Sequence, residues 1–443
     1  MPLIYSNRKD IIWIIAIIFI FTAAFLKVNQ YKKTFSFKNH RQSNIQSTSA
    51  TPLNQTMFLV SNRFSAITHS SSLIELDNGN IRAFWYSGSK ACASDVEIRT
   101  TVFNIKRNRW GKEHTVITRD ATQKGLHRFI RTIGNAVPVR AANGNLQLFY
   151  VTISLGGWAG SSITRIQSVD DGKTWSQPER LITSPFLNIS TLVKGAPFLY
   201  QDGSIGLPVY HEFIYKFTEL IHIGKRGNVI DKQRLSTGNT ATLQPVVLVK
   251  SANEAQILMR NAKATSSHRA KVTSTSDGGK HWTSLLDTNI PNQDSALAVI
   301  VLSNHLLLAV TNDIEDGRDR LSLAISNDGL TWKSIYRLED QRNNRELTEA
   351  QQPIHILEQL KTSDSRFKLL LINHHNKHVD QIQQETCKQG GCSFEFSYPY
   401  LILTHKGDLH LTYTWNRRNI KHRVFTQAWL NQHIKRSAYD TRN

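Results

Sequence analysis

Cysteine is scarce in this chain, with three residues among 443. An odd and low number excludes a fold that is held together by a framework of disulfides. Cys387 and Cys392 flank the sequence Lys-Gln-Gly-Gly, and they either pair in an oxidising compartment or stay as two thiols. Their spacing is not that of a zinc site, and no paired ligands accompany it, so we expect no metal.

The chain also lacks long basic runs in its body, recognised nucleic-acid-binding motifs and long stretches of helical periodicity. It does carry an excess of positive charge, with 54 Lys and Arg against 34 Asp and Glu and a net charge of +20. A dispersed excess of this kind favours acidic partners. Anionic sugars and lipid surfaces fit such a chain better than nucleic acid does, because no nucleic-acid motif is present.

One long apolar run is present, from Ile11 to Leu26. It is slightly short for a membrane-spanning helix and slightly long for the core of a signal peptide. No small-x-small cleavage site follows it, and positive charge flanks both ends, which leaves the orientation open. We predict an N-terminal tail at 1–10, an uncleaved transmembrane signal anchor at 11–27 and a polar linker at 28–57. A cleaved signal peptide is the alternative.

The rest of the chain alternates short apolar runs with turn sequences. Ile81–Tyr86 and Leu146–Val151 are typical runs, and Asn143-Gly is a typical turn. Many evenly spaced strands predict an all-β protein, and a β-propeller in particular. We place the propeller at 58–432, with an irregular polar insertion at 336–393 and a basic tail at 433–443.

Three stretches that end in Trp share one pattern and support this fold. They are Ser168–Trp175, Thr275–Trp282 and Ile325–Trp332, and we interpret the third as carrying Asn327 in place of the Asp of the other two. In each, the Asp carboxylate can bind backbone N–H groups of the turn, the Gly supplies a positive φ, and the Trp packs under the hairpin. Recurring turns of this kind predict repeated sheets, and we assign them a structural role.

These boxes, together with Leu155–Ser161, Phe396–Ile402 and Leu411–His422 with its Trp-Asn-Arg-Arg motif, resemble the sialidase (neuraminidase) superfamily, in particular bacterial-type exo-α-sialidases with Asp-box (BNR) repeats. The resemblance runs from roughly Ser65 to Trp429. It implies a six-bladed propeller with a central cationic pocket, and hydrolysis of terminal sialic acids with retention of configuration. It also implies a Tyr nucleophile and no cofactor.

The chemistry of such a reaction explains these residue types. The substrate carries a carboxylate beside its anomeric carbon, and guanidinium groups bind that carboxylate bidentately. A neutral phenol attacks without the repulsion that a second anion would meet, but it needs a neighbouring base. A separate carboxylic acid protonates the departing sugar oxygen.

By this resemblance, Tyr398 is the nucleophile and Asp95 is the general acid. Arg260 and Arg320 are the arginines that hold the substrate carboxylate. Glu212 is a candidate for the base that activates the tyrosine.

The chain departs from the family pattern at two positions. His69 stands where the first carboxylate-binding arginine is expected, and Gln244 stands where the activating glutamate is expected. A neutral amide cannot take a proton, so Glu212 or Glu395 would have to replace it. Lys90 can add positive charge to the pocket.

The departures leave three functions open: a sialidase, a propeller that binds acidic glycans without cleaving them, and a glycosidase for another acidic sugar. The expected partners are sialylated or other acidic glycans, with the membrane as a partner of the N-terminal helix. Because such glycans lie outside cells or in secretory lumens, we expect the propeller to be extracytoplasmic.

Overall fold

The computed structural model describes most of the chain. The described residues are 8–30, 36–38, 51–59, 67–184, 187–235, 240–262, 268–302, 306–344, 351, 354–356, 358–359, 387–388, 391–392 and 394–439.

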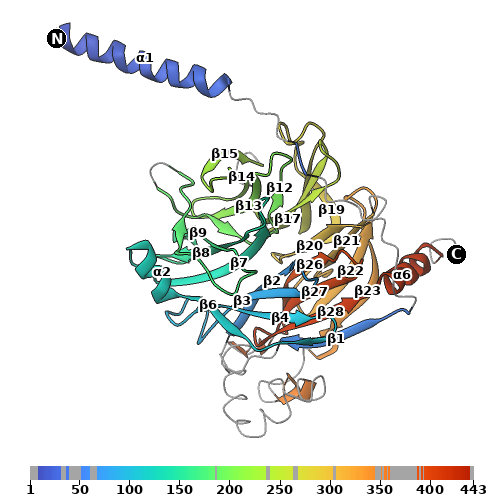
Figure 1. The fold of residues 1–443 in the computed structure, drawn as a ribbon. Helices are drawn as coiled ribbons and strands as arrows, with labels where there is room; N and C mark the ends of the chain where they lie inside the picture. The colour runs from blue at the N-terminus through green and yellow to red at the C-terminus, as the bar shows by residue number, and fades with distance from the viewer. Residues whose placement is uncertain are drawn as a thin grey trace.

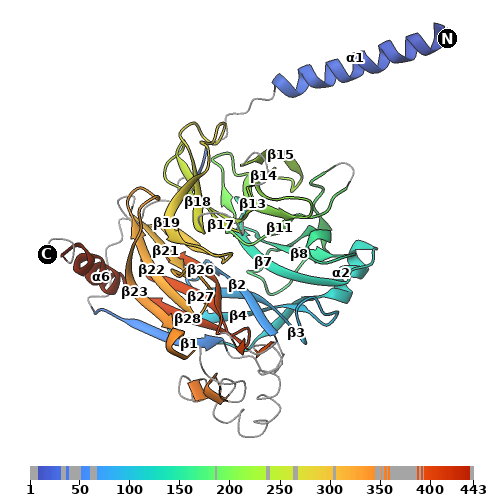
Figure 2. The same cartoon turned by 180° about the vertical axis from the view of Figure 1, so that it is seen from behind.

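Six antiparallel sheets make up the body of the protein, and they are arranged around a common centre (Figures 1 and 2). The first three sheets consist of β2 (Ile67–Glu75), β3 (Ile81–Gly88), β4 (Glu97–Asn104), β5 (Arg109–Trp110) and β6 (His114–Thr118); β7 (Thr132–Arg140), β8 (Leu146–Ile153), β9 (Ser161–Ser168) and β10 (Glu179–Arg180); and β11 (Leu192–Val193), β12 (Phe198–Leu199), β13 (Ile205–Glu212), β14 (Lys216–Ile223) and β15 (Val229–Arg234). The other three consist of β16 (Thr242–Val249), β17 (Ala255–Asn261), β18 (Arg269–Thr275) and β19 (Leu286–Pro291); β20 (Ala298–Val301), β21 (Leu307–Thr311), β22 (Arg320–Ser326) and β23 (Lys333–Asp340); and β26 (Phe396–Leu403), β27 (Leu409–Trp415), β28 (Asn419–Phe425) and β1 (Asn54–Leu59). The predicted six-bladed β-propeller is confirmed, and we number its sheets blades 1 to 6 in this order.

The ring is closed by the N-terminal strand. β1 pairs with β28 in antiparallel register, from Asn54 opposite Phe425 to Leu59 opposite Ile420, and so forms the outer strand of blade 6. This pairing covers the outer edge of β28, which would otherwise expose unpaired backbone groups. It also ties the two ends of the propeller together.

The strand order gives the propeller two functionally different faces. The second main strand of each blade (β3, β8, β13, β17, β21 or β27) ends at one face, here called the site face. The third strand runs back, so the turns that join third and fourth strands lie on the opposite face. All three Trp-ending boxes are turns of this second kind, because they follow β9, β18 and β22. Their position away from the site face agrees with the structural role that the sequence predicts for them.

The third box is one residue shorter than the first, and our interpretation of Asn327 was wrong. Asp328 supplies the carboxylate: its Oδ1 accepts hydrogen bonds from the Ser326 hydroxyl at 2.9 Å and from the N–H groups of Leu330 and Thr331 at 2.8 Å each. Asp170 makes the equivalent bonds in the first box. The pattern is therefore kept by a deletion after the Asp and not by a substitution of it.

The apolar N-terminal run forms α1 (Arg8–Gln30), which projects away from the propeller (Figures 1 and 2). Its large apolar side chains, such as Trp13 and Phe19, are exposed. Within the described part of the chain, no helix has both the length and the apolar character that crossing a membrane requires. The predicted transmembrane signal anchor at 11–27 is not supported.

The segment predicted as a polar linker is attached to the propeller at Phe37. This side chain is fully buried, and its ring stacks on Tyr200 and meets the edge of Phe198. Its N–H donates to the carbonyl of Ala252 at 2.9 Å. Tyr200 and Ala252 lie in turns at the face opposite the site face, so the N-terminal segment is held there, at the seam between blades 3 and 4.

The remaining predicted segments differ from the structure in their details. β23 continues to Asp340, inside the segment predicted as an irregular insertion, and most of 345–393 lies outside the described residues. Two short strands, β24 (Cys387–Lys388) and β25 (Gly391–Cys392), place the backbones of the two cysteines opposite each other. The tail begins inside a helix, α6 (Gln427–Tyr439), which packs on blade 5 and the last strands of blade 6.

Candidate active site

Four innermost strands are distorted in the same way near the site face. Each has a break in its pairing register, and each break contains a residue with positive φ. These residues are Ser70 (54°) in β2, Asn135 (39°) in β7, Gln244 (49°) in β16 and Tyr398 (53°) in β26. Left-handed backbone at a non-glycine residue costs free energy and marks sites where a side chain has to be redirected. The distortions gather these residues around the centre of the ring.

Tyr398 and Gln244 meet there although they come from blades 6 and 4. The Gln244 side-chain amide donates a hydrogen bond to the Tyr398 phenol oxygen, with 3.1 Å between Nε2 and Oη. Arg260 Nη1 donates to Gln244 Oε1 at 3.0 Å. Because arginine only donates, this bond fixes the amide with its N–H groups towards the phenol. The Tyr398 oxygen is therefore an acceptor here, and Gln244 cannot take the phenol proton.

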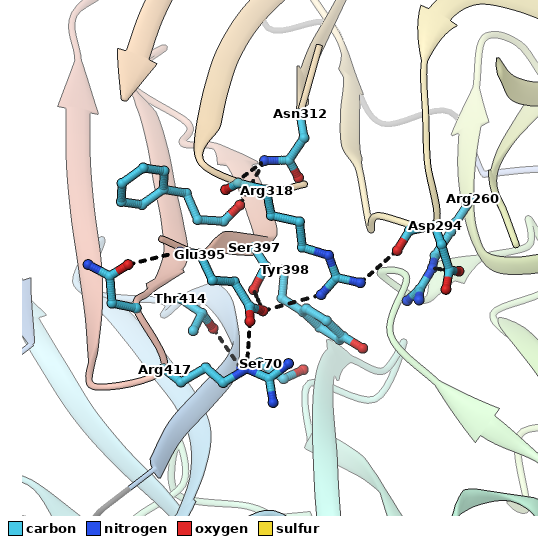
Figure 3. A network of polar contacts seen from close by, with 12 residues as sticks. Ser70, Arg260, Asp294, Asn312, Arg318, Glu395, Ser397, Tyr398, Thr414 and Arg417 are labelled. Carbon is cyan, nitrogen blue, oxygen red and sulfur yellow. Dashed lines mark hydrogen bonds and ion pairs between the residues drawn. The ribbon is translucent and has the colours of Figure 1, made fainter. Parts of the chain in front are cut away.

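Glu395 lies three residues before Tyr398 in the chain and binds two guanidinium groups (Figure 3). Arg417 Nε donates to one of its oxygens at 2.6 Å, and Arg318 Nη1 donates to the other at 3.2 Å. Ser397 Oγ donates to the same carboxylate at 2.6 Å. Burial alone would raise the pKa of Glu395, but Arg417 and Arg318 outweigh it and lower the pKa to about 2. This carboxylate positions the arginines and is not a free base.

Arg318 spans the space between blades 5 and 6 at the centre (Figure 3). Besides Glu395, it donates from Nη2 to the carbonyl of Asp294 at 2.6 Å. Asp294 in turn accepts from Arg260 Nε at 2.7 Å through its carboxylate. Arg260, Arg318 and Arg417 thus form one connected arc on blades 4, 5 and 6.

Arg320, which the sequence favoured, lies outside this arc. It is the first residue of β22, and its Nε faces Asp313 at 3.3 Å and Asp340 at 3.9 Å. Arg318 reaches the centre because it precedes the strand. A positive φ at Gly317 redirects the backbone. The backbone of Arg318 then forms an isolated parallel β-bridge with that of Glu395. Arg318 and Arg320, which are two residues apart, therefore have different partners.

His69 lies in the centre, but it carries no charge there. Its ring is buried, 4.3 Å from the Tyr398 ring and edge-on to Tyr86 at 5.6 Å. Burial lowers the pKa of His69 to about 3, so the imidazole is neutral near pH 7. The position expected for the first carboxylate-binding arginine thus contributes an aromatic wall and no cation.

Two basic residues of the centre, Arg417 and Lys194, were not singled out from the sequence. Arg417 follows β27 in left-handed conformation, within the Trp-Asn-Arg-Arg motif that carries the resemblance. Lys194 follows β11, is buried, and donates from Nζ to the Pro399 carbonyl at 3.2 Å. Burial lowers the pKa of Lys194 to about 7. No sequence signal marks Lys194, because its role depends on β11 facing β26 across the ring.

The remaining predicted site residues lie on turns of the site face. Asp95 and Lys90 are exposed in the turn after β3, and the Asp95 carboxylate accepts from the Ser89 N–H at 3.0 Å and hydroxyl at 2.9 Å. Glu212 ends β13, and its N–H donates to Ser190 Oγ at 2.9 Å. Burial raises the pKa of Glu212 against the opposing effect of Arg260. The carboxylate of Glu212 therefore binds a proton more strongly than an exposed glutamate does.

The structure thus brings Tyr398, Gln244, Arg260 and His69 together and places Glu212, Asp95 and Lys90 around the rim. Three guanidinium groups face two carboxylates in the centre, so the arc keeps a positive charge that can attract an anion. Among the residues that the structure describes, no group of His, Cys, Asp and Glu has the arrangement of a metal site.

The fold defines a six-bladed propeller of the architecture found in sialidases. The family model of the BNR repeat-like domain matches residues 79–411, and the chain belongs to this family. No curated protein sequence matches the chain significantly.

Several solved structures share the fold at low identity. A Hadza microbial sialidase, Hz136, is 15% identical with a TM-score of 0.57, over 82% of this chain and 66% of that one. The Ruminococcus gnavus intramolecular trans-sialidase, in complex with oseltamivir carboxylate, is 11% identical with a TM-score of 0.57, over 84% and 97%. Trypanosoma rangeli sialidase is 14% identical with a TM-score of 0.57, over 86% and 61%. This chain therefore spans about two thirds of the Hz136 structure and less than two thirds of the Trypanosoma rangeli structure.

Proposed function

We propose that the protein is a glycosidase that removes a terminal sialic-acid-type sugar, with Tyr398 as the nucleophile. The observation that carries this proposal is the placement of the Tyr398 phenol, which the strained backbone of β26 directs into the arc of Arg260, Arg318 and Arg417. An acidic sugar whose carboxylate binds these guanidinium groups would hold its anomeric carbon near the phenol.

The roles of the other residues follow from their chemistry. Tyr398 attacks the anomeric carbon and forms a glycosyl–enzyme bond, which water then breaks with overall retention. Arg260 stabilises negative charge on the phenol oxygen through Gln244. Glu212, with its raised pKa, is the proposed proton acceptor, and Asp95 on its exposed turn is the proposed acid for the departing oxygen.

A second function, binding of acidic glycans without cleavage, is favoured by Gln244 and His69. One is neutral where a base would activate the tyrosine, and the other is neutral where a cation would hold the substrate. Hydrolysis of a different acidic sugar is a variant of the first proposal. In either case the substrate class places the propeller outside the cytoplasm, and we propose that location on this ground alone.

Turnover of a fluorogenic sialoside separates these functions. We expect slow release of the fluorophore by the parent protein and none by Tyr398→Phe, while Tyr336→Phe, a change in the outer strand of blade 5, keeps the parent rate. Binding of the sialoside without any turnover by the parent protein would contradict the hydrolase and support the binding function. Turnover that persists in Tyr398→Phe would contradict the role of the nucleophile.

A further inference from the structure

We propose that the mouth of the site carries a docking surface for an apolar aglycone, so that the substrate is an amphiphilic glycoside with an acidic sugar at one end. The surface, here called the apolar ridge, consists of Leu155, Leu187, Phe213, Ile214 and Tyr215. This inference rests on the proposed acidic-sugar site and adds the class of the group to which the sugar is attached.

The members of the ridge are large apolar side chains that face solvent. The exposed fraction is 57% for Phe213, 74% for Ile214 and 53% for Tyr215, and these residues form the turn between β13 and β14. It is 76% for Leu155, in the equivalent turn of blade 2, and 70% for Leu187, in the connection from blade 2 to blade 3. Clustered exposed apolar side chains on a soluble domain mark interaction sites.

These segments lie side by side on the site face. Blades 2 and 3 are neighbours in both views (Figures 1 and 2). The short helix η1 (Trp158–Gly160), which follows the turn of Leu155, contacts β13. Ser190, three residues after Leu187, accepts the backbone hydrogen bond of Glu212 at 2.9 Å. The ridge is therefore built on the same strand end that carries Glu212.

The ridge is continuous with the candidate site. Glu212 directly precedes Phe213, and Arg260 and Asp294 are close enough to Glu212 to influence its pKa. A group attached to a sugar in the centre can leave the pocket across this strand end. That continuity identifies the occupant as part of the substrate.

On blades 5 and 6, across the mouth from the ridge, the turns of the site face carry charged and polar side chains. In blade 5 the turn after β21 carries Asp313, Glu315, Asp316, Arg318 and Asp319, and in blade 6 the turn after β27 is Asn416–Arg418. The guanidinium arc also lies on blades 4 to 6. A ligand with its carboxylate on this guanidinium arc would have its apolar group over blades 2 and 3.

Two glycosides of the same acidic sugar test the proposal, one with a methyl and one with an octyl aglycone, each below its micelle concentration. The dissociation constants are measured by calorimetry with the full-length protein. We expect the parent protein to bind the octyl glycoside roughly ten- to a hundredfold more tightly, because apolar area is buried. In the double variant Phe213→Ser, Ile214→Ser this ratio should fall several-fold, while the affinity for the methyl glycoside stays unchanged.

The matched control is Val169→Ser. Val169 is 81% exposed at the tip of the first box, on the opposite face, and its loss should leave the ratio unchanged. Both changes are in exposed turns, and thermal melting checks that the variants stay folded. An octyl preference that the double variant does not reduce, or equal affinities in the parent protein, would overturn the ridge while leaving the sugar site intact.

Two other outcomes also count against the proposal. If neither glycoside binds, the acidic-sugar site itself is wrong, and the aglycone surface fails with it. If the parent protein self-associates in size-exclusion chromatography and the double variant does not, the ridge is an interface between copies of this chain.

Discussion

The side-chain amide of Gln244 and the phenol of Tyr398 are hydrogen-bonded at 3.1 Å across the centre of the propeller, and the amide is the donor. The donor role is imposed by Arg260, which occupies the amide oxygen. A glutamate at position 244 would instead offer a carboxylate oxygen to the phenol proton while keeping its bond to Arg260. The residue at position 244 therefore determines whether Tyr398 has a base beside its phenol.

Replacing Gln244 by Glu should therefore increase hydrolysis of a fluorogenic sialoside. A positioned general base contributes about 10²–10⁴-fold to rate, and we expect the gain in kcat to lie towards the lower end because the site did not evolve around it. The double variant Gln244→Glu, Tyr398→Phe serves as the control and should show no gain. A Gln244→Glu protein that is no faster than the parent, with unchanged substrate affinity, would argue against Tyr398 as the attacking group.

The neighbouring arginines 318 and 320 should respond differently to the same change. Arg318→Met removes a guanidinium that bridges Glu395 and Asp294 in the central arc, so binding of an acidic sugar should weaken by roughly a hundredfold. Arg320→Met breaks only contacts to Asp313 and Asp340 and should change that affinity by less than about threefold. Calorimetric titration with free sialic acid measures both. Equal losses would mean that the structure has assigned the two side chains to the wrong sites.

The sequence was sufficient to predict the propeller, because strands and box turns repeat along the chain and each signal is local. It also led to Tyr398, Arg260 and Gln244, whose neighbouring sequence carries the family resemblance. The sequence favoured Arg320, whereas the structure places Arg318 in the central arc, and the two positions differ only in where β22 begins. That boundary depends on Gly317 and on a bridge to Glu395, a residue of another blade.

Contacts between distant blades could not be predicted from the sequence. Lys194 contacts Pro399 only because β11 and β26 face each other across the ring. Glu395 was considered as a base from its closeness to Tyr398 in the chain, but two arginines from blades 5 and 6 neutralise it in the structure. Phe37 was placed in a polar linker because its partners Phe198 and Tyr200 lie far along the chain.

The third box provides a test of stability with two adjacent residues. Asp328→Ala removes an acceptor that serves the N–H groups of Leu330 and Thr331, whereas Asn327→Ala removes an exposed side chain. The first change should lower the midpoint of thermal unfolding by a few degrees, and the second should leave it within about one degree. Differential scanning calorimetry of the two variants and the parent measures this. A larger effect at Asn327 would restore the reading in which that residue replaces the Asp.

A buried pair of histidines should make the protein unstable in mild acid. His410 Nδ1 and His422 Nε2 are 3.0 Å apart, and both side chains are buried. Burial lowers the pKa of His410 to about 3, and burial together with His410 lowers the pKa of His422 well below its usual value. In the unfolded chain both histidines titrate near their ordinary pKa of about 6.5.

The sign of the effect follows from proton uptake. Above pH 6.5 both rings are neutral in the folded and unfolded states, so their contribution does not change with pH. As the pH falls below 6.5, the unfolded state binds protons that the folded state excludes, and the free energy of unfolding falls by about 2 kcal/mol per histidine by pH 5. Urea denaturation at pH 7.5 and pH 5 measures this loss.

His422→Gln should reduce the loss of unfolding free energy between pH 7.5 and pH 5 by the contribution of one histidine. This holds whatever the substitution does to the stability at either pH. His405→Gln, a change at an exposed histidine beside Glu75, is the matched control and should alter this loss less than His422→Gln does. If the His422→Gln and parent proteins lose the same free energy between pH 7.5 and pH 5, then His422 is not held neutral in the folded protein.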